Sequence, residues 1–152
     1  MGNTLYMAYG SNLNRAQMAQ RCPAAKPVGP GVLENYRLVF RAGGQGVYLT
    51  VEPCPGESVP VGLWEVTPRD EAALDEYEGY PELYRRALLP VLGQEGVQQA
   101  LIYIMHETYP LAAPGEAYVD ACREGCEDFG LDTGPLLRAV ALARQGQEVP
   151  HE

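Results

Sequence analysis

Short apolar runs bounded by glycine and proline fill the first two-thirds of the chain and predict β-strands. The runs that predict strands are Leu5–Tyr9, Tyr36–Phe40, Val47–Glu52, Val59–Val66, Tyr84–Leu92 and Gln98–His106. Turn-forming residues separate them, since Pro53-Cys54-Pro55-Gly56 follows one run and Gly93–Gly96 joins the last two. The pattern therefore predicts a chain in which strands come first and follow one another closely.

Helical patterns are fewer, and most of them lie near the end of the chain. Asn14–Gln20 is a short helical segment, and Glu116–Phe129 and Pro135–Gln145 are longer ones. The apolar stripe expected on the last helix consists of Leu136, Leu137, Val140 and Ala141. Because the helices do not alternate regularly with the strands, the order favours an α+β fold over a doubly wound parallel sheet.

The clearest helix start in the sequence is at Thr67. Thr67 can cap the helix, Pro68 suits its first position, and Asp70 stands where the acid of a capping box belongs. We expect this helix to run to about Glu78 and to stop at Gly79, a residue that readily adopts the left-handed conformation of a helix end.

Length and charge narrow the class of protein. The chain has 152 residues, 46% of them hydrophobic, which suits one globular domain over residues 1–152. Its net charge of -9 and the lack of a basic cluster argue against nucleic acid or an anionic membrane as partner. No apolar run approaches the ~20 residues that span a bilayer, and no secretory pattern opens the chain. We therefore expect a cytoplasmic protein.

The four cysteines are expected to be ordinary thiols, because the chain has a cytoplasmic profile and enough residues for a core. They are Cys22, Cys54, Cys122 and Cys126. A zinc site would need further ligands at suitable spacing, and the two histidines are isolated. We expect neither a metal nor another cofactor.

The first candidate site is the segment Tyr9-Gly10-Ser11-Asn12-Leu13, which joins a strand to a helix. Such a loop offers free backbone N–H groups to an anion. A phosphate loop would contain more glycines and a lysine, so a carboxylate or a developing oxyanion is the better fit. The alternative is that Ser11 or Asn12 only caps the following helix.

The second candidate site is Glu78, at the end of the helix that begins after Thr67. Leu74 lies four residues earlier and shares its face, so Glu78 should lean toward the core, whereas Glu76 should point to solvent. Burial and the negative end of the helix dipole would both raise the pKa of its carboxyl group, which suits a general base. The alternative is a solvated acidic run with no special role.

Taken together, these segments resemble the γ-glutamylcyclotransferase family along nearly the whole chain. The motifs that carry the resemblance are Tyr9-Gly10-Ser11-Asn12-Leu13, Gly62-Leu63-Trp64, Leu74-Asp75-Glu76-Tyr77-Glu78-Gly79 and Tyr84-Arg85-Arg86. The resemblance implies a mixed β-barrel with flanking helices. It also implies a reaction that cyclises a γ-glutamyl amine or γ-glutamyl amino acid to 5-oxoproline and releases an amine.

The same resemblance implies the residues of the site. Glu78 matches the catalytic glutamate of the family and would act as general acid and base. The substrate-binding residues implied in this sequence are Tyr6, Met7, Ala8, Tyr9, Gly10, Ser11, Asn12, Tyr84 and Tyr118. Asn12 departs from the Tyr-Gly-Ser-Leu loop of the glutathione-specific branch, so the leaving amine stays open.

Two rival interpretations follow from the same residues. The fold could serve as a non-catalytic module that binds a small molecule or regulates another protein. A glycoside hydrolase would pair Glu78 with Asp75 or Glu76, but acids on one helical turn point in different directions rather than flanking one bond. The sequence does not specify the oligomeric state.

Overall fold

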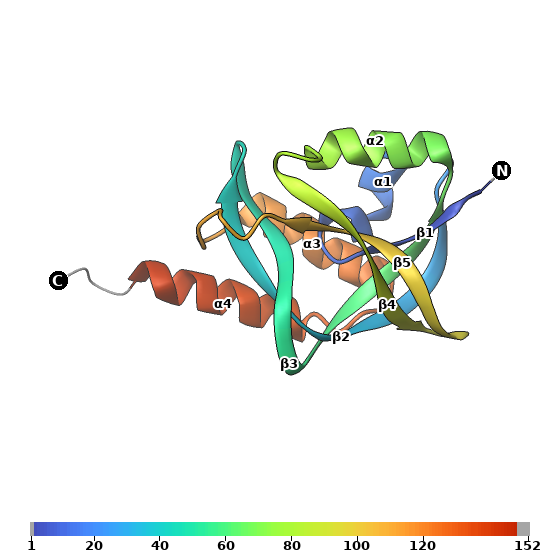
Figure 1. Ribbon diagram of the computed structural model, residues 1–152. Coiled ribbons are helices and arrows are strands. Elements are labelled where there is room, and N and C mark those ends of the chain that lie inside the picture. Colours follow the sequence, from blue (N-terminus) through green and yellow to red (C-terminus); the bar gives the residue numbers. More distant parts are fainter. Residues whose placement is uncertain (1, 149–152) are drawn as a thin grey trace.

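The computed structural model describes residues 2–148, in which five strands close into a barrel. The strands are β1 (Thr4–Ala8), β2 (Lys26–Gly43), β3 (Gly46–Val66), β4 (Tyr84–Gly93) and β5 (Gly96–Met105). Their order around the barrel is β1-β3-β2-β4-β5, and neighbours pair antiparallel except where β5 meets β1 in parallel at Leu101 and Tyr6. The predicted mixed barrel is confirmed (Figure 1).

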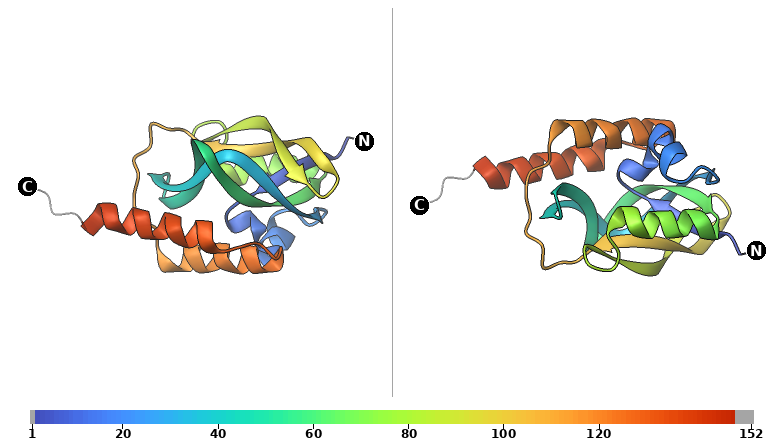
Figure 2. Two further views of the ribbon diagram at one scale, coloured as in Figure 1. Left: turned by 90° about the horizontal axis from the view of Figure 1, so that it is seen from below. Right: turned by 90° about the horizontal axis from the view of Figure 1, so that it is seen from above.

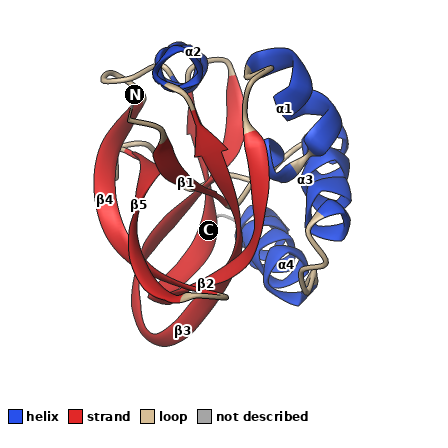
Figure 3. Ribbon diagram, turned by 90° about the vertical axis from the view of Figure 1, so that its right-hand side faces the viewer, coloured by secondary structure: helices blue, strands red, loops and turns tan. Residues whose placement is uncertain are grey.

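Most of the helices lie together on one side of the barrel, and one helix lies apart from them. They are the 3-10 helix η1 (Ser11–Leu13) and the α-helices α1 (Arg15–Arg21), α2 (Pro68–Glu78), α3 (Glu116–Asp128) and α4 (Gly134–Glu148). Figure 3 shows α1, α3 and α4 together on one side, with α2 apart from them. Both views of Figure 2 show α3 and α4 side by side. None of the helices in the described residues is long and apolar enough to cross a membrane.

The predicted turn at Pro53–Gly56 is wrong, because β3 continues through these residues. The ladder between β2 and β3 shifts register between Glu34 and Tyr36 instead of reversing. At this irregularity Asn35 and Gly56 adopt positive φ angles of 67° and 87°, and the Gly56 N–H donates to Asn35 Oδ1 at 3.1 Å. The turn-forming residues therefore make a bulge within a long strand.

The first half of β2 was not predicted as a strand, because Pro27, Gly29 and Pro30 weaken the pattern there. These residues pair with β3 on one side only, while the pairing of β2 with β4 on the other side is at Val32 and Leu92. A proline, which has no N–H to donate, is tolerated on a strand edge that needs no partner.

The helix after Thr67 begins and ends as predicted. The Thr67 side chain accepts a hydrogen bond from the Asp70 N–H at 3.1 Å, and the Asp70 carboxylate accepts one from the Thr67 N–H at 3.2 Å. Gly79 ends the helix in the left-handed conformation, with φ at 68°. This capping fixes the position of Glu78, the last residue of α2.

The apolar stripe predicted on α4 is partly wrong. Leu136 and Val140 are buried, but Leu137 is 46% exposed and Ala141 is also exposed. The buried face runs through Leu136, Ala139 and Val140, because side chains three and four residues apart share one face of a helix. Leu137 is turned by about 100° from Leu136 on the side away from Ala139, which places it beyond the contact with the barrel.

The loop before α1 is held between α3 and the barrel. A side chain at Gly125 of α3 would place its Cβ 2.5 Å from Leu13 Cβ and 2.6 Å from the Asn14 nitrogen, so a glycine is needed for this close approach. On the other side, the indole N–H of Trp64 in β3 donates to the Asn12 carbonyl at 3.0 Å. These contacts set the position of the first candidate site.

Candidate active site

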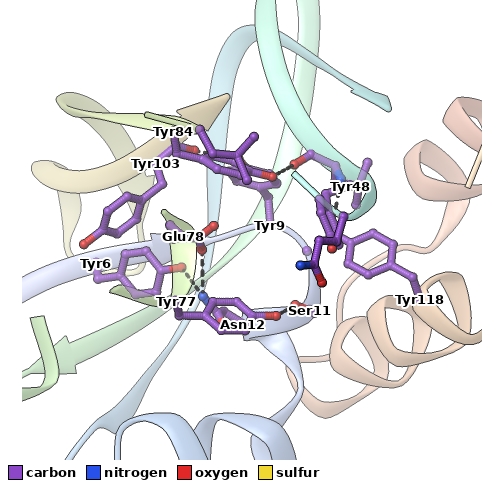
Figure 4. A pocket seen from close by; sticks show the side chains of 14 residues that line it. Tyr6, Tyr9, Ser11, Asn12, Tyr48, Tyr77, Glu78, Tyr84, Tyr103 and Tyr118 are labelled. Carbon is purple, nitrogen blue, oxygen red and sulfur yellow. Dashed lines mark hydrogen bonds between the residues drawn. The ribbon is translucent and has the colours of Figure 1, made fainter. Parts of the chain in front are cut away.

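The two candidate segments meet at one pocket of ≈ 270 Å³, drawn in Figure 4. Most of the predicted residues line it: Tyr6, Tyr9, Gly10, Ser11, Asn12, Glu78, Tyr84 and Tyr118. They come from β1, the loop and η1, α2, β4 and α3. Residues far apart in the sequence therefore face a single small space, as a shared substrate site requires.

Glu78 provides the carboxylate of this pocket. Its Oε2 accepts a hydrogen bond from Asn12 Nδ2 at 3.1 Å. Burial raises the pKa of its carboxyl group to about 7, although the positive charge of Arg21 and the hydrogen bond from Asn12 act in the opposite direction. Glu78 is partly exposed because one of its sides faces the open pocket. Protein atoms surround its other sides and exclude most of the solvent there. At this pKa the group can both take and return a proton near neutral pH.

The other acids of the same helical turn do not face the pocket. Asp75 accepts hydrogen bonds from Arg86 Nη1 at 2.9 Å and from the Tyr103 hydroxyl at 2.5 Å, and Glu76 is exposed as predicted. Among the residues that line the pocket, Glu78 is the only acid. The paired carboxylates of a glycoside hydrolase are therefore not assembled here.

Asn12 lies beside Glu78 and is buried. Its amide nitrogen donates to the Tyr6 hydroxyl at 2.9 Å and to Glu78, and its carbonyl oxygen accepts from Arg21 Nη1 at 2.5 Å. Figure 4 shows the hydrogen bond between Asn12 and Glu78. The alternative that Asn12 caps the helix is wrong, because the cap of α1 is Asn14, whose side chain accepts from the Gln17 N–H at 3.1 Å.

Gly10 and Ser11 form the part of the loop where an anion could approach the backbone. In η1 the Leu13 N–H donates to the Gly10 carbonyl and the Asn14 N–H to the Ser11 carbonyl. The first N–H groups of such a turn take no part in its own hydrogen bonds. The Ser11 hydroxyl is 3.3 Å from the Tyr77 hydroxyl and 3.4 Å from Arg21 Nη1, so Ser11 also does not cap α1.

Tyrosine rings make up most of the wall, and hydrogen bonds to the backbone hold several of them. The Tyr84 hydroxyl donates to the Leu49 carbonyl at 2.9 Å, and the Tyr118 hydroxyl accepts from the Leu49 N–H at 3.1 Å. The Tyr9 hydroxyl donates to the Tyr103 carbonyl at 2.6 Å. Burial raises the pKa of Tyr9, Tyr84 and Tyr118, so these hydroxyl groups stay neutral.

Two predicted residues lie elsewhere, and several lining residues were missed. Met7 and Ala8 of β1 are buried in the core and do not line the pocket. The residues that sequence reasoning missed are Gln45, Tyr48, Leu49, Tyr77, Leu83 and Tyr103. Tyr77 directly precedes Glu78 and could have been found, whereas Gln45 and Tyr48 reach the pocket only because the hairpin of β2 and β3 extends to it.

The described residues hold no group of three or more His, Cys, Asp and Glu side chains placed to bind a metal ion. Cys22, Cys122 and Cys126 are buried and Cys54 is partly buried, and all four are free. Burial raises the pKa of Cys122 to about 12, so its thiol stays protonated beside the pocket residue Tyr118.

The fold and the pocket define a mixed β-barrel protein with a tyrosine-walled site around one glutamate. The profile of the family described as "Gamma-glutamyl cyclotransferase, AIG2-like" matches residues 6–121. A human γ-glutamylcyclotransferase is 28% identical over 135 residues, which cover 84% of this chain and 72% of the human one. The chain therefore belongs to the γ-glutamyl cyclotransferase, AIG2-like family.

Solved structures agree with this assignment. A structure described as γ-glutamyl cyclotransferase has a TM-score of 0.80 at 26% identity, and the match covers 99% of this chain and 90% of that one. The YkqA protein of Bacillus subtilis has a TM-score of 0.77 at 21% identity, with coverage of 100% of this chain and 57% of that one. At this lower identity the similarity to YkqA concerns the fold alone.

Proposed function

We propose that the protein is a cyclotransferase that converts a γ-glutamyl amine or γ-glutamyl amino acid to 5-oxoproline and a free amine. The observation that carries the proposal is one carboxylate, with its pKa raised to about 7, in the same small pocket as the loop at Gly10 and Ser11. Family membership supports a γ-glutamyl compound as the substrate class.

In the proposed reaction Glu78 moves two protons, one after the other, from the attacking nitrogen to the leaving nitrogen. Its carboxylate takes a proton from the α-ammonium group of the substrate. The lone pair that this frees on the nitrogen attacks the γ-carbonyl carbon. A carbon–nitrogen bond forms and the carbonyl oxygen becomes an oxyanion. Protonated Glu78 then gives the proton to the leaving nitrogen as the original amide bond breaks, which restores the carboxylate and the carbonyl group. The ring nitrogen still carries one proton too many, and the restored carboxylate takes it to leave the neutral lactam N–H. Glu78 passes this second proton to the released amine, which departs as an ammonium ion.

The pocket would contribute mainly by position. The attack is intramolecular, so walls that hold the glutamyl chain curled account for a large part of the rate. Backbone N–H groups at Gly10 and Ser11 are suited to hold the α-carboxylate or the oxyanion. Every proton transfer in this scheme uses Glu78, and we propose that the reaction proceeds without a metal or another cofactor.

The direct test is a panel of γ-glutamyl amino acids, γ-glutamyl amines and glutathione, each incubated with the protein in the presence and absence of a chelator. We expect 5-oxoproline and free amine in equal amounts from at least one compound, unaffected by chelation. Loss of activity on chelation that zinc or magnesium restores would contradict the metal-free scheme. Binding without turnover across the panel would favour a non-catalytic module.

The activity should fall in acid because Glu78 must be ionised to take a proton. Its pKa is raised to about 7, so the fraction in the carboxylate form decreases as the pH falls through that value. We expect kcat/KM to rise with pH up to about 7 and then to level off, because Glu78 is ionised above that pH. A profile that stays flat down to about pH 5, near the ordinary pKa of glutamate, would contradict this environment for Glu78.

A further inference from the structure

Arg21, the last residue of α1, does not line the pocket but contacts three side chains that do. Its Nη1 donates to Asn12 Oδ1 at 2.5 Å and lies 3.4 Å from Ser11 Oγ. Its guanidinium carbon lies 3.9 Å from the centre of the Tyr77 ring. One cation outside the pocket thus reaches both the loop and α2.

We propose that Arg21 is a positioning residue that fixes the amide of Asn12 toward Glu78 and keeps the Glu78 carboxylate ready to accept a proton. This inference rests on the proposed role of Glu78 as the base. It concerns a side chain that neither motif contains, since Arg21 lies nine residues after Asn12.

The first argument is the orientation of the Asn12 amide. An asparagine side chain has a carbonyl oxygen on one side and an NH₂ group on the other, and neighbours decide which way it points. A guanidinium group can only donate, so the oxygen must face Arg21. The NH₂ group is then turned toward the Tyr6 hydroxyl and Glu78 Oε2, at 2.9 Å and 3.1 Å. Without Arg21 the opposite orientation would place an oxygen against the carboxylate.

The second argument is that Arg21 is itself held in place. Gln17, four residues earlier on α1, accepts a hydrogen bond from Arg21 Nη2 at 2.5 Å. The flat guanidinium group stacks on Tyr77, a contact that favours arginine over lysine. Because Nη1 and Nη2 of the guanidinium group both have hydrogen-bond partners, the donor to Asn12 is fixed before a substrate binds.

The third argument is charge. The titratable side chains that line the pocket with Glu78 are Tyr6 of β1, Tyr9 directly after β1, Tyr48 of β3, Tyr77 of α2, Tyr84 of β4, Tyr103 of β5 and Tyr118 of α3. Burial raises the pKa of Tyr6, Tyr9, Tyr84, Tyr103 and Tyr118, which keeps their hydroxyl groups neutral. Arg21 lowers the pKa of Glu78 by its positive charge, against the larger effect of burial.

The test compares Arg21→Gln and Arg21→Lys with Arg15→Gln, an exposed arginine on the same helix, as control. Carbon-13 NMR of the labelled Glu78 carboxyl group measures its pKa without any substrate. We expect Arg21→Gln to raise the pKa of Glu78 by roughly 1 pH unit or more, as loss of a nearby opposite charge does. Arg21→Lys should keep the pKa closer to that of the parent, and Arg15→Gln should not change it.

Kinetics give the second measurement. At about pH 6.5 we expect kcat/KM of Arg21→Gln to fall about eightfold or more, since a rise of the Glu78 pKa from about 7 to about 8 leaves roughly an eighth of the carboxylate. The loss of kcat/KM should be smaller at about pH 9, where Glu78 is ionised in both proteins. The loss that remains at this pH measures the effect of the misplaced Asn12 amide. A structural role alone would lower thermal stability and leave the pH profile in place. An unchanged profile and an unchanged Glu78 titration would overturn the proposal.

The parent protein provides a check that does not depend on a folded variant. The side-chain amide resonances of Asn12 should shift with the same midpoint as the Glu78 carboxyl group, because the two share a hydrogen bond. Asn12 resonances that do not respond to this titration would overturn the proposal. If the parent releases no 5-oxoproline, the proposed function fails, while the NMR titrations still decide the role of Arg21.

Discussion

Replacing Glu78 with glutamine is expected to lower the rate of 5-oxoproline release by at least ~10²-fold, the lower limit for loss of a general base. Glutamine has nearly the same size, and its side-chain oxygen can still accept the hydrogen bond that Asn12 Nδ2 donates to Glu78 at 3.1 Å. It cannot take the proton of the α-ammonium group, so only the chemical step is removed. Steady-state kinetics on an active γ-glutamyl compound measure the loss.

The same substitution should leave the fold intact and make it slightly more stable. The pKa of Glu78 is raised from 4.5 to about 7 in the folded protein, so the folded state binds this proton more tightly than the unfolded chain. Its contribution to stability is fully present below pH about 4.5 and is lost as the pH rises through about 7. Glu78→Gln should therefore gain stability relative to the parent above this range and show no gain below it.

Glu76→Gln is the matched control, since Glu76 lies two residues earlier on the same helix and is exposed. It should change neither the turnover nor the pH dependence. Near-normal 5-oxoproline release by Glu78→Gln, together with loss of activity in Glu76→Gln, would show that the base is assigned to the wrong residue. Inactivity of the parent and both variants on every γ-glutamyl compound would favour the binding-module interpretation.

Gly10→Val is expected to lower turnover by at least ~10²-fold, because displacement of a site by about 1 Å can reduce the rate by that factor. Even a single Cβ at Gly10 would lie 3.1 Å from the Tyr118 hydroxyl and 3.6 Å from Leu49 Cβ. Valine adds two methyl groups at this point, which would displace the Tyr118 hydroxyl from the Leu49 N–H and block the approach to the loop backbone.

Ser11→Ala is the companion variant, and it should reduce turnover only about 2- to 10-fold, the value of one ordinary hydrogen bond. Its hydroxyl contacts Tyr77 and Arg21 at 3.3 Å and 3.4 Å, but the proposed contact with the substrate uses the backbone. Kinetics of both variants on the same substrate compare the two effects. Equal and mild effects would show that the loop backbone is not at the reaction centre.

Much of the fold could be predicted where local signals and burial agree. The capping box of Thr67 and Asp70 and the glycine at position 79 fixed both ends of α2, and with them the place of Glu78. The hairpin of β4 and β5 follows its apolar runs and its turn at Gly93–Gly96 closely. In these segments each residue prefers the structure that the whole fold requires.

Other features depend on contacts that a single sequence does not reveal. The residues at Pro53–Gly56 read as a turn, yet they form a bulge because the partner strand supplies Asn35 opposite Gly56. On α4, the barrel and not the helical period alone decides that Ala139 is buried and Leu137 is exposed.

The candidate site shows the same division between local and long-range information. The motifs placed Glu78 and the loop at Gly10–Asn12 at one pocket, but they did not reveal Arg21, whose link to Asn12 spans two elements. Tyr48 and Gln45 were missed for a similar reason, since a long hairpin carries them to the pocket. Contacts of this kind arise from the topology of the barrel.

The most direct test of the central claim is the fate of the substrate carbonyl in water enriched in oxygen-18. An intramolecular cyclisation with Glu78 as acid and base uses no water, so we expect 5-oxoproline without the heavy isotope and an equal amount of amine, formed by the parent and not by Glu78→Gln. Release of glutamate that carries one oxygen-18 atom would mean that water attacks the γ-carbonyl, and it would contradict the proposed cyclotransferase activity.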